Sequence, residues 1–330
     1  MAEKRRSNSR EERSKSQEGK SSLVFRPKKK PVFSIERGST VIERTQQSEL
    51  EHLVPISSAT AAAVLLDYGF QVVRIIGEGS YSKVYEVIQQ PNRKRYAAKI
   101  IRLHKQSTNY QTKFWPQELE VMSVIEHPNI IFIRKILSVK QNSIIIIIME
   151  YAVNGTLVSQ LKDKPLSEET AKKLFVQIFD GVRYLHSKGI AHRDLKLENI
   201  MLDGKNKPLI SDFSYSLFCE KDKKMTDFCG TPCYFSPQIL RNEPYNPFLY
   251  DVWSIAVCLY IMTNGTLPFE FGTQDSDHSM MLRQQLNREW KFRNKCLSPE
   301  LKDLLNKMLE PDPLRRYTMD QVLRHPWCRR

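Results

Sequence analysis

The sequence contains no long apolar segment, and this sets the first limit on what the protein can be. Its longest strongly apolar run, Ile144–Met149, is far too short to cross a bilayer. No apolar core follows the basic residues at the N-terminus, so we expect no secretory signal. We therefore expect no membrane partner and a reducing, cytoplasmic environment, because the six cysteines lack the paired spacing of a disulfide framework or metal site. They are Cys219, Cys229, Cys233, Cys258, Cys296 and Cys328.

Positive charge exceeds negative charge and is concentrated at the start of the chain. The formal net charge is +14, and residues 1–30 contribute +7 of it from eleven basic and four acidic residues. Residues 1–57 have few periodic apolar positions, so we expect a disordered N-terminal extension. The run Arg26–Pro31 suits nuclear import or polyanion binding, although a solvated tail is the favoured interpretation. Nucleic-acid binding as a main role would need an aromatic and basic surface, which we do not find.

The apolar pattern predicts an ordered domain that begins with a short helix near Ala61. After Asn154 helical spacing predominates, and Ser167 as N-cap with Gly189 as a stop predicts a long helix. Between the helix near Ala61 and Asn154 we expect one helix at Gln111–Ile125 and five strands. The strands are Gln71–Ile76, Lys83–Gln89, Arg95–Ile101, Ile130–Val139 and Ile144–Met149. The sequence thus predicts an α+β fold, in which a small sheet with one helix precedes a larger helical body.

One short loop carries a set of residues suited to phosphoryl transfer. Residues 192–199 read His-Arg-Asp-Leu-Lys-Leu-Glu-Asn. An acid (Asp194) can accept the proton of a hydroxyl, a cation (Lys196) can offset charge on the moving phosphoryl group, and an amide (Asn199) can hold Mg²⁺. The same order of residues is part of the protein-kinase signature.

Two upstream motifs supply partners for this loop. Gly77–Val84 lies between predicted strands, and its glycines let backbone N–H groups approach phosphate oxygens, although a flexible hairpin explains such a run equally well. Lys99 ends a strand 22 positions after Gly77 and matches the lysine that binds α- and β-phosphates. A lysine that points inward needs an anion, and we prefer Glu118 over Glu120 for this role.

Downstream motifs complete the pattern. Asp212 follows a strand 18 positions after Asp194 and is placed to bind Mg²⁺ together with Asn199. Gly230–Pro237 fits a segment that seats the substrate, and Asp251 fits a buried carboxylate that braces the loop at 192–199.

These motifs resemble those of eukaryotic protein kinases over Tyr68 to Trp327. Asp-Leu-Lys at 194–196, together with Thr231, is similar to the serine/threonine branch. Gly-Glu-Gly-Ser-Tyr at 77–81, Asp-Phe-Ser at 212–214 and Lys-Phe-Trp-Pro-Gln-Glu at 113–118 resemble the testis-specific serine/threonine kinases.

The resemblance implies a two-lobed kinase domain over residues 68–327, with an N-terminal lobe at about 68–151 and a C-terminal lobe at about 152–327. It also implies that ATP with Mg²⁺ would lie between the lobes and that proteins with Ser or Thr acceptors would be the substrates. The catalytic domain would be a monomer, with a chaperone or a regulatory protein as an optional partner. The implied ATP contacts are Ile76, Gly77, Glu78, Gly79, Ser80, Val84, Ala97, Lys99, Glu118, Met149, Glu150 and Ala152.

The segment between Asp212 and Pro237, here called the activation segment, departs from the family pattern. Asp227 stands four residues before Thr231, where related kinases carry a phosphorylated threonine. Arg193 is the residue that usually grips that phosphate, so we hypothesise an Asp227–Arg193 pair that keeps the segment active. Thr226 is an alternative phosphorylation site, and a solvated Asp227 is the plain alternative.

Three further departures bear on activity. Gln238 replaces a glutamate that would pair with Arg316, which predicts a looser substrate-seating segment. Ser82 replaces the third glycine of the loop at 77–84, and Ser214 should reduce the freedom of Asp212 to flip. They leave a catalytically weak scaffold as the alternative to an active enzyme, although every residue with a direct chemical role is present.

Overall fold

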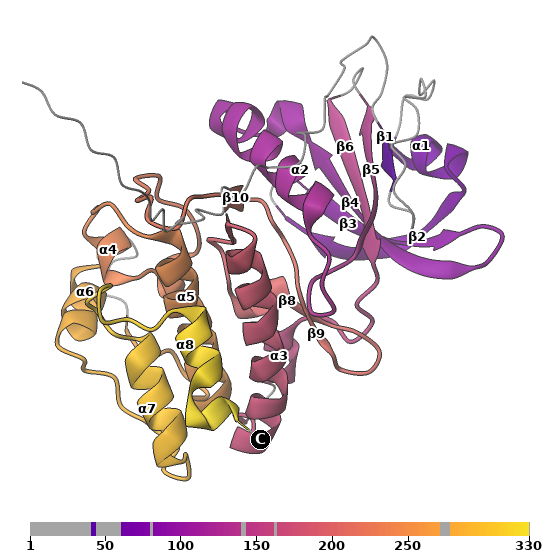
Figure 1. The fold of residues 1–330 in the computed structure, drawn as a ribbon. Coiled ribbons are helices and arrows are strands. Elements are labelled where there is room, and N and C mark those ends of the chain that lie inside the picture. The colour runs from indigo at the N-terminus through magenta and orange to yellow at the C-terminus, as the bar shows by residue number, and fades with distance from the viewer. Residues whose placement is uncertain are drawn as a thin grey trace, which may run out of the picture. The chain divides into compact units, whose positions relative to one another are not determined.

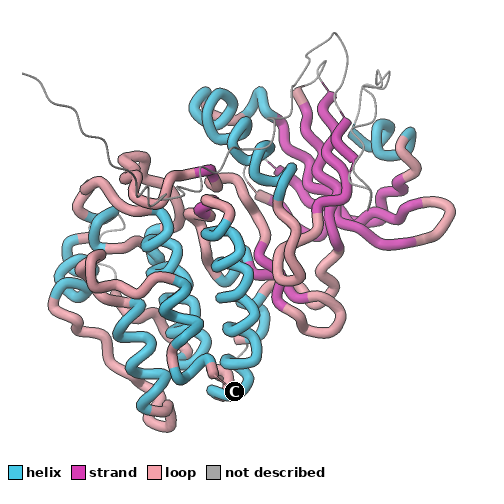
Figure 2. The backbone as a smooth tube through the Cα atoms, viewed as in Figure 1, coloured by secondary structure: helices cyan, strands magenta, loops and turns pink. Residues whose placement is uncertain are grey.

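The computed structural model describes residues 41–43, 61–79, 82–139, 143–161, 164–270 and 278–329. All of them belong to one compact unit, Gly38–Arg330 (Figure 1). Strands gather in its earlier part and helices in its later part (Figure 2). This arrangement confirms the predicted two-lobed α+β fold. Ser80 and the basic run 26–31 lie outside the described residues.

The N-terminal lobe is built on a six-stranded sheet in the order β1-β5-β6-β4-β3-β2, with every neighbouring pair antiparallel. Sequence analysis did not predict β1, which pairs with β5 from within the expected extension. The strands are β1 (Val41–Glu43), β2 (Phe70–Glu78), β3 (Ser82–Gln89), β4 (Lys94–Arg102), β5 (Ile133–Val139) and β6 (Ile144–Glu150).

Side chains alternate across β4, and this alternation points Lys99 toward the functional site. Ala98 joins one apolar cluster with Val64 and Leu65 of helix α1 (Ala61–Asp67). Ile101 joins the other cluster, which is shared with the C-terminal lobe. Because successive strand residues face opposite ways, Lys99 lies on the same face as Ile101, away from α1.

The predicted helix at 111–125 consists of two parts. A π-helical turn, η2 (Tyr110–Phe114), leads directly into α2 (Trp115–Val124). Pro116 lies in the first turn of α2, where a missing N–H costs nothing. Glu118 follows on the face that turns inward and is 1% exposed.

The C-terminal lobe is organised around α5 (Pro247–Asn264), which is buried over almost its whole length. It packs against α3 (Glu168–Ser187) and α7 (Pro299–Met308). Ser167 caps α3 as predicted, because its side chain accepts a hydrogen bond from the Thr170 N–H. The remaining helices are α4 (Pro237–Leu240), α6 (Ser279–Leu286), α8 (Met319–Arg324) and the short turns η1 (Leu103–Lys105), η4 (Leu157–Gln160), η5 (Leu197–Asn199), η6 (Pro232–Tyr234) and η7 (Pro326–Cys328).

Two small antiparallel pairs present the loops of the candidate site. One joins β7 (Ile190–Ala191) to β10 (Leu217–Phe218), and the other joins β8 (Ile200–Leu202) to β9 (Pro208–Ile210). The motif at 192–199 therefore runs from the end of β7 to the start of β8, and Asp212 follows β9. Within the described residues, every helix is too short or too polar to span a membrane.

Candidate active site

A single buried carboxylate holds the loop that follows β7. Asp251 of α5 is fully buried and accepts hydrogen bonds from the backbone N–H groups of His192 (2.9 Å) and Arg193 (2.8 Å). Its Oδ2, which accepts from His192, also lies 2.9 Å from Nε2 of His186 on α3. These contacts maintain the left-handed φ of 64° at Arg193. Asp251 therefore braces the loop, as its motif predicts.

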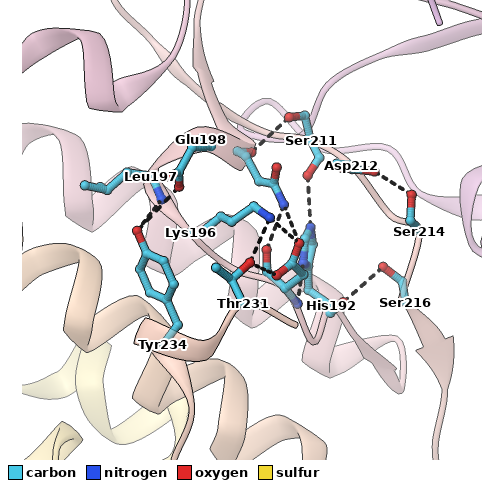
Figure 3. Close-up of polar contacts among 12 residues, drawn as sticks. His192, Lys196, Leu197, Glu198, Ser211, Asp212, Ser214, Ser216, Thr231 and Tyr234 are labelled. Atoms are coloured by element: carbon cyan, nitrogen blue, oxygen red, sulfur yellow. Dashed lines mark hydrogen bonds and ion pairs between the residues drawn. The ribbon is translucent and has the colours of Figure 1, made fainter. Parts of the chain in front are cut away.

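Three side chains converge on the carboxylate of Asp194, which is only 6% exposed. Lys196 Nζ lies 2.8 Å from Oδ2, and the Thr231 hydroxyl donates to Oδ1 at 3.0 Å. Lys196 also donates to Thr231 at 2.9 Å (Figure 3), and Asn199 Nδ2 donates to Oδ2 of Asp194 at 3.1 Å. Although burial opposes its charge, Asp194 raises the pKa of Lys196. The Asp194 carboxylate is thus held beside a cation.

Lys99 lies between two acidic side chains from different parts of the chain. Its Nζ is 2.8 Å from Oδ1 of Asp212 but 3.9 Å from Oε1 of Glu118. Burial opposes the ionised form of Asp212, yet the Lys99 ammonium holds the pKa of that carboxyl well below its usual range. Burial raises the pKa of Glu118 despite the same ammonium. Glu118 is therefore near Lys99 as predicted, but Asp212 is its closer partner.

Most of the predicted ATP contacts surround one cavity of about 490 Å³, a size usual for small-molecule sites. Glu118 is not in its lining, although it lies 3.9 Å from Nζ of Lys99. Sequence analysis did not anticipate the apolar residues Met122, Ile131, Ile133, Ile147, Met201 and Phe213 in the lining. The predicted residues that line it are Ile76, Gly77, Glu78, Gly79, Val84, Ala97, Lys99, Met149, Glu150 and Ala152.

Two oxygen-bearing side chains, Asn199 and Asp212, line the same cavity. The described part of the chain holds no group of three His, Cys, Asp or Glu side chains that could bind a metal by itself. Mg²⁺ is commonly held by one or two carboxylates together with phosphate oxygens and water. The donor set therefore fits Mg²⁺ that arrives with a phosphorylated ligand.

Comparison with known proteins decides the family, since residues 70–328 match the protein kinase domain. The chain belongs to the protein kinase family. It is 37% identical to human testis-specific serine/threonine-protein kinase 1, over 81% of this chain and 73% of the relative. Mouse testis-specific serine/threonine-protein kinase 2 is also 37% identical, over 81% and 75%. Mouse testis-specific serine/threonine-protein kinase 3 is 36% identical, over 80% and 97%. Membership implies ATP as the phosphoryl donor and proteins as acceptors.

The activation segment of this kinase differs from the predicted arrangement. The Asp227–Arg193 pair is wrong: Asp227 Oδ2 instead lies 2.5 Å from Nζ of Lys113 on η2. Arg193 is fully buried, and its Nε donates to the backbone oxygen of Tyr215 at 2.8 Å. Asp227 is partly exposed near the surface, where Lys113 can reach it and the buried guanidinium cannot. Thr226, the alternative phosphorylation site, is exposed.

Gln238 bonds to Arg316 as predicted. Its Oε1 accepts from Nη2 of Arg316 at 2.9 Å, and its Nε2 donates to the Pro311 oxygen at 2.8 Å. Arg316 is 4% exposed and lies over the Trp253 ring, with its Cζ 4.8 Å from the ring centroid. Burial lowers the pKa of Arg316. The start of α4 is therefore anchored to a buried cation through a neutral amide.

Sequence reasoning missed two contacts of the helical segment that carries Glu118. The Tyr110 hydroxyl donates to Oε2 of Glu118 at 2.7 Å, and Lys113 reaches the activation segment. Both residues lie on η2, where the π-helical turn replaces the expected α-helical spacing. The only sequence signal was the aromatic and basic composition of 110–115, which does not say which way a side chain points.

Proposed function

We propose that this kinase transfers the γ-phosphoryl group of Mg²⁺–ATP to Ser and Thr hydroxyls of protein substrates. The observation that carries the proposal is the convergence of Lys196 and Thr231 on Asp194, which also accepts a hydrogen bond from Asn199 in the lining of the cavity. The resemblance of the chain to kinases named as serine/threonine-specific supports the choice of acceptor.

Each polar residue of the site has one role in this proposal. Lys99 binds the α- and β-phosphates, and Asp194 accepts the proton of the substrate hydroxyl. Lys196 offsets charge on the transferred group and holds the Asp194 carboxylate in place. Asn199 and Asp212 would hold Mg²⁺, which would neutralise charge on the phosphate groups.

The remaining predicted contacts position the nucleotide. The backbone of Gly77–Gly79 approaches the phosphates, while Val84 and Ala97 cover the base from the sheet. Met149 to Ala152 form the strip that connects the lobes and offer backbone groups to the base. The apolar character of most of the lining favours a planar aromatic ring in the deeper part of the cavity.

Asp227 supports activity without phosphorylation, through Lys113 and not through Arg193. The carboxylate ties the activation segment to η2, the turn that leads into the helix of Glu118. Aspartate brings one negative charge where phosphothreonine brings nearly two, so this tether should be weaker than a phosphate-based one. We propose that it gives the kinase basal activity in its unphosphorylated form.

Radiolabelled ATP and a generic protein substrate test the assignment directly. The Asp194→Asn variant keeps the size of the side chain but cannot accept a proton, so phosphoryl transfer should fall at least about 100-fold. The Asp251→Asn variant is unsuitable as a control because it disturbs the loop itself. Glu120→Gln is suitable, because Glu120 is the competing acid on α2 and lines no part of the cavity. Equal transfer by wild type and Asp194→Asn would favour a scaffold instead.

A further inference from the structure

The serine in the Asp-Phe-Ser motif lies among three charged groups of the site. Ser214 Oγ is 2.6 Å from Oδ1 of Asp212, a contact visible in Figure 3. It is also 3.3 Å from Nζ of Lys99 and 3.4 Å from Oε1 of Glu118. A glycine at this position would offer none of these contacts.

The geometry indicates which way the Ser214 hydroxyl is oriented. A hydroxyl has one proton to donate, and the short distance to Asp212 lies in the range of charge-assisted O–H···O⁻ bonds. Lys99 has only protons to give, so Ser214 accepts from it. The longer contact to Glu118 is then secondary. Ser214 thus adds a bridged path between Lys99 and Asp212 to their direct ion pair.

The same hydroxyl occupies the space between two carboxylates that repel each other. Asp212 and Glu118 share a single ammonium, and Lys99 is closer to Asp212 by more than an ångström. On its other oxygen Glu118 accepts from Tyr110 at 2.7 Å. Ser214 and Tyr110 therefore hold the two carboxylates in place where the Lys99–Glu118 contact alone is loose.

The backbone accommodates the serine without strain. Asp212 adopts a left-handed φ of 62°, whereas Ser214 is not among the residues with positive φ. A side chain at 214 is thus compatible with the observed turn, and its Cβ also removes conformations that glycine would allow.

We propose that Ser214, supported by Tyr110, is a positioning residue that fixes the Asp212 carboxylate against Lys99 before nucleotide binds. The inference rests on the proposed role of Asp212 as a metal ligand. A preset Asp212 binds metal without first losing its own rotational freedom. The kinase should then need less Mg²⁺ for nucleotide binding than a form without the hydroxyl.

Two substitutions separate the hydroxyl from the backbone effect. Ser214→Ala removes the hydroxyl and keeps Cβ, while Ser214→Gly removes both. Hydrogen–deuterium exchange of residues 210–216 in the nucleotide-free protein should speed up in both variants. The Mg²⁺ concentration that half-saturates binding of a non-hydrolysable ATP analogue should rise roughly tenfold in both, since a charge-assisted hydrogen bond is lost.

A matched control and a second variant protect this test from a loss of folding. Ser216→Ala removes a buried hydroxyl from the same segment, one that contacts the His192 oxygen at 3.5 Å and not Asp212, so its Mg²⁺ dependence should match wild type. Tyr110→Phe, which acts from η2, should raise the Mg²⁺ requirement about two- to fivefold. Melting temperatures of all variants should stay within about 3 °C of wild type, because each substitution removes only one hydroxyl and its hydrogen bonds.

The outcomes distinguish this inference from the proposed function. Faster exchange and a raised Mg²⁺ requirement in Ser214→Ala support the positioning role. Wild-type values in Ser214→Ala overturn it, including the case where only Ser214→Gly differs, since backbone freedom would then be the cause. Analogue binding needs no phosphoryl transfer, so an inactive wild type that still shows the Ser214 effect would refute the function and keep the inference.

Discussion

Replacing Gln238 by glutamate should stabilise this kinase, because Gln238 contacts Arg316, a buried cation that forms no ion pair with a carboxylate among the described residues. Arg316 donates to the backbone oxygens of Glu310 and Leu249 and to the Gln238 amide, which are neutral acceptors. The free-energy cost of removing the Arg316 guanidinium from water is the same in wild type and variant. Gln238→Glu therefore adds a countercharge while it buries only one new ion.

The expected size follows from three contributions. A carboxylate about 4 Å from the guanidinium centre gains about 4 kcal/mol at an effective dielectric constant near 20. Removing that carboxylate from water costs roughly 2 kcal/mol, a low value because hydrogen-bond donors of Arg316 already face it. The lost donation from Gln238 to Pro311 costs about 1 kcal/mol. The remainder is about 1 kcal/mol of added stability, or a rise in Tm of roughly 2–4 °C.

Calorimetry and peptide kinetics check this estimate. We expect the higher Tm together with a KM for peptide substrate about two- to threefold lower and an unchanged kcat, because α4 follows the substrate-seating segment. Gln285→Glu is the matched control. Like Gln238, Gln285 is buried and donates to a backbone oxygen, here that of Phe235. Unlike Gln238, its Oε1 has no hydrogen-bond partner among the described residues. That variant should lose about 2 kcal/mol or more. An unchanged or lower Tm in Gln238→Glu would refute the reasoning.

Two further experiments test the activation segment. A double-mutant cycle of Asp227→Ala and Lys113→Ala should give a coupling energy of about 0.5–1 kcal/mol in thermal unfolding, and additive effects would exclude the tether. Each single variant, after phosphatase treatment, should also have several-fold lower kinase activity than wild type. Gly230→Ala should lower the free energy of unfolding by about 2–4 kcal/mol, because at φ 105° the added Cβ would lie 2.6 Å from Oη of Tyr250 and 2.9 Å from the Arg193 oxygen. An unchanged midpoint of chemical denaturation would contradict that close packing.

Regular elements explain why the sequence located the principal site residues. Lys99 points into the cavity because strand alternation fixes its face once the strand is recognised. Asp194 and Asp212 come together because each directly follows a short strand of a small antiparallel pair. Spacing between motifs is therefore informative wherever secondary structure of known period connects them. The contact of Gln238 with Arg316, which the structure confirms, was predicted from the family pattern and not from the period of a helix or strand.

The contacts that the sequence did not predict depend on irregular backbone or on burial. Tyr110 and Lys113 lie on a π-helical turn, which rotates side chains away from the positions that 3.6-residue spacing would give. The expected Asp227–Arg193 pair is not observed, because the spacing of two residues in the sequence does not show how deeply each side chain is buried. Arg193 is fully buried while Asp227 is partly exposed. A partner with a longer, flexible and half-exposed side chain, Lys113, could reach the carboxylate instead.

Two of the polar contacts between the helical segment with Glu118 and the C-terminal lobe differ in strength. The Lys113–Asp227 pair is about one-third to two-fifths exposed, so solvent and salt weaken it. The contacts of Ser214 involve Asp212, whose side chain is 38% exposed, and Lys99, whose side chain is only 15% exposed. Because Lys99 is well shielded from solvent, these contacts should respond less to salt than the Lys113–Asp227 pair does. Added salt should therefore loosen the activation segment before it disturbs the nucleotide site. Loss of Asp227 should accordingly affect the KM for protein substrate more than the affinity for nucleotide, whereas loss of the Ser214 hydroxyl should do the reverse.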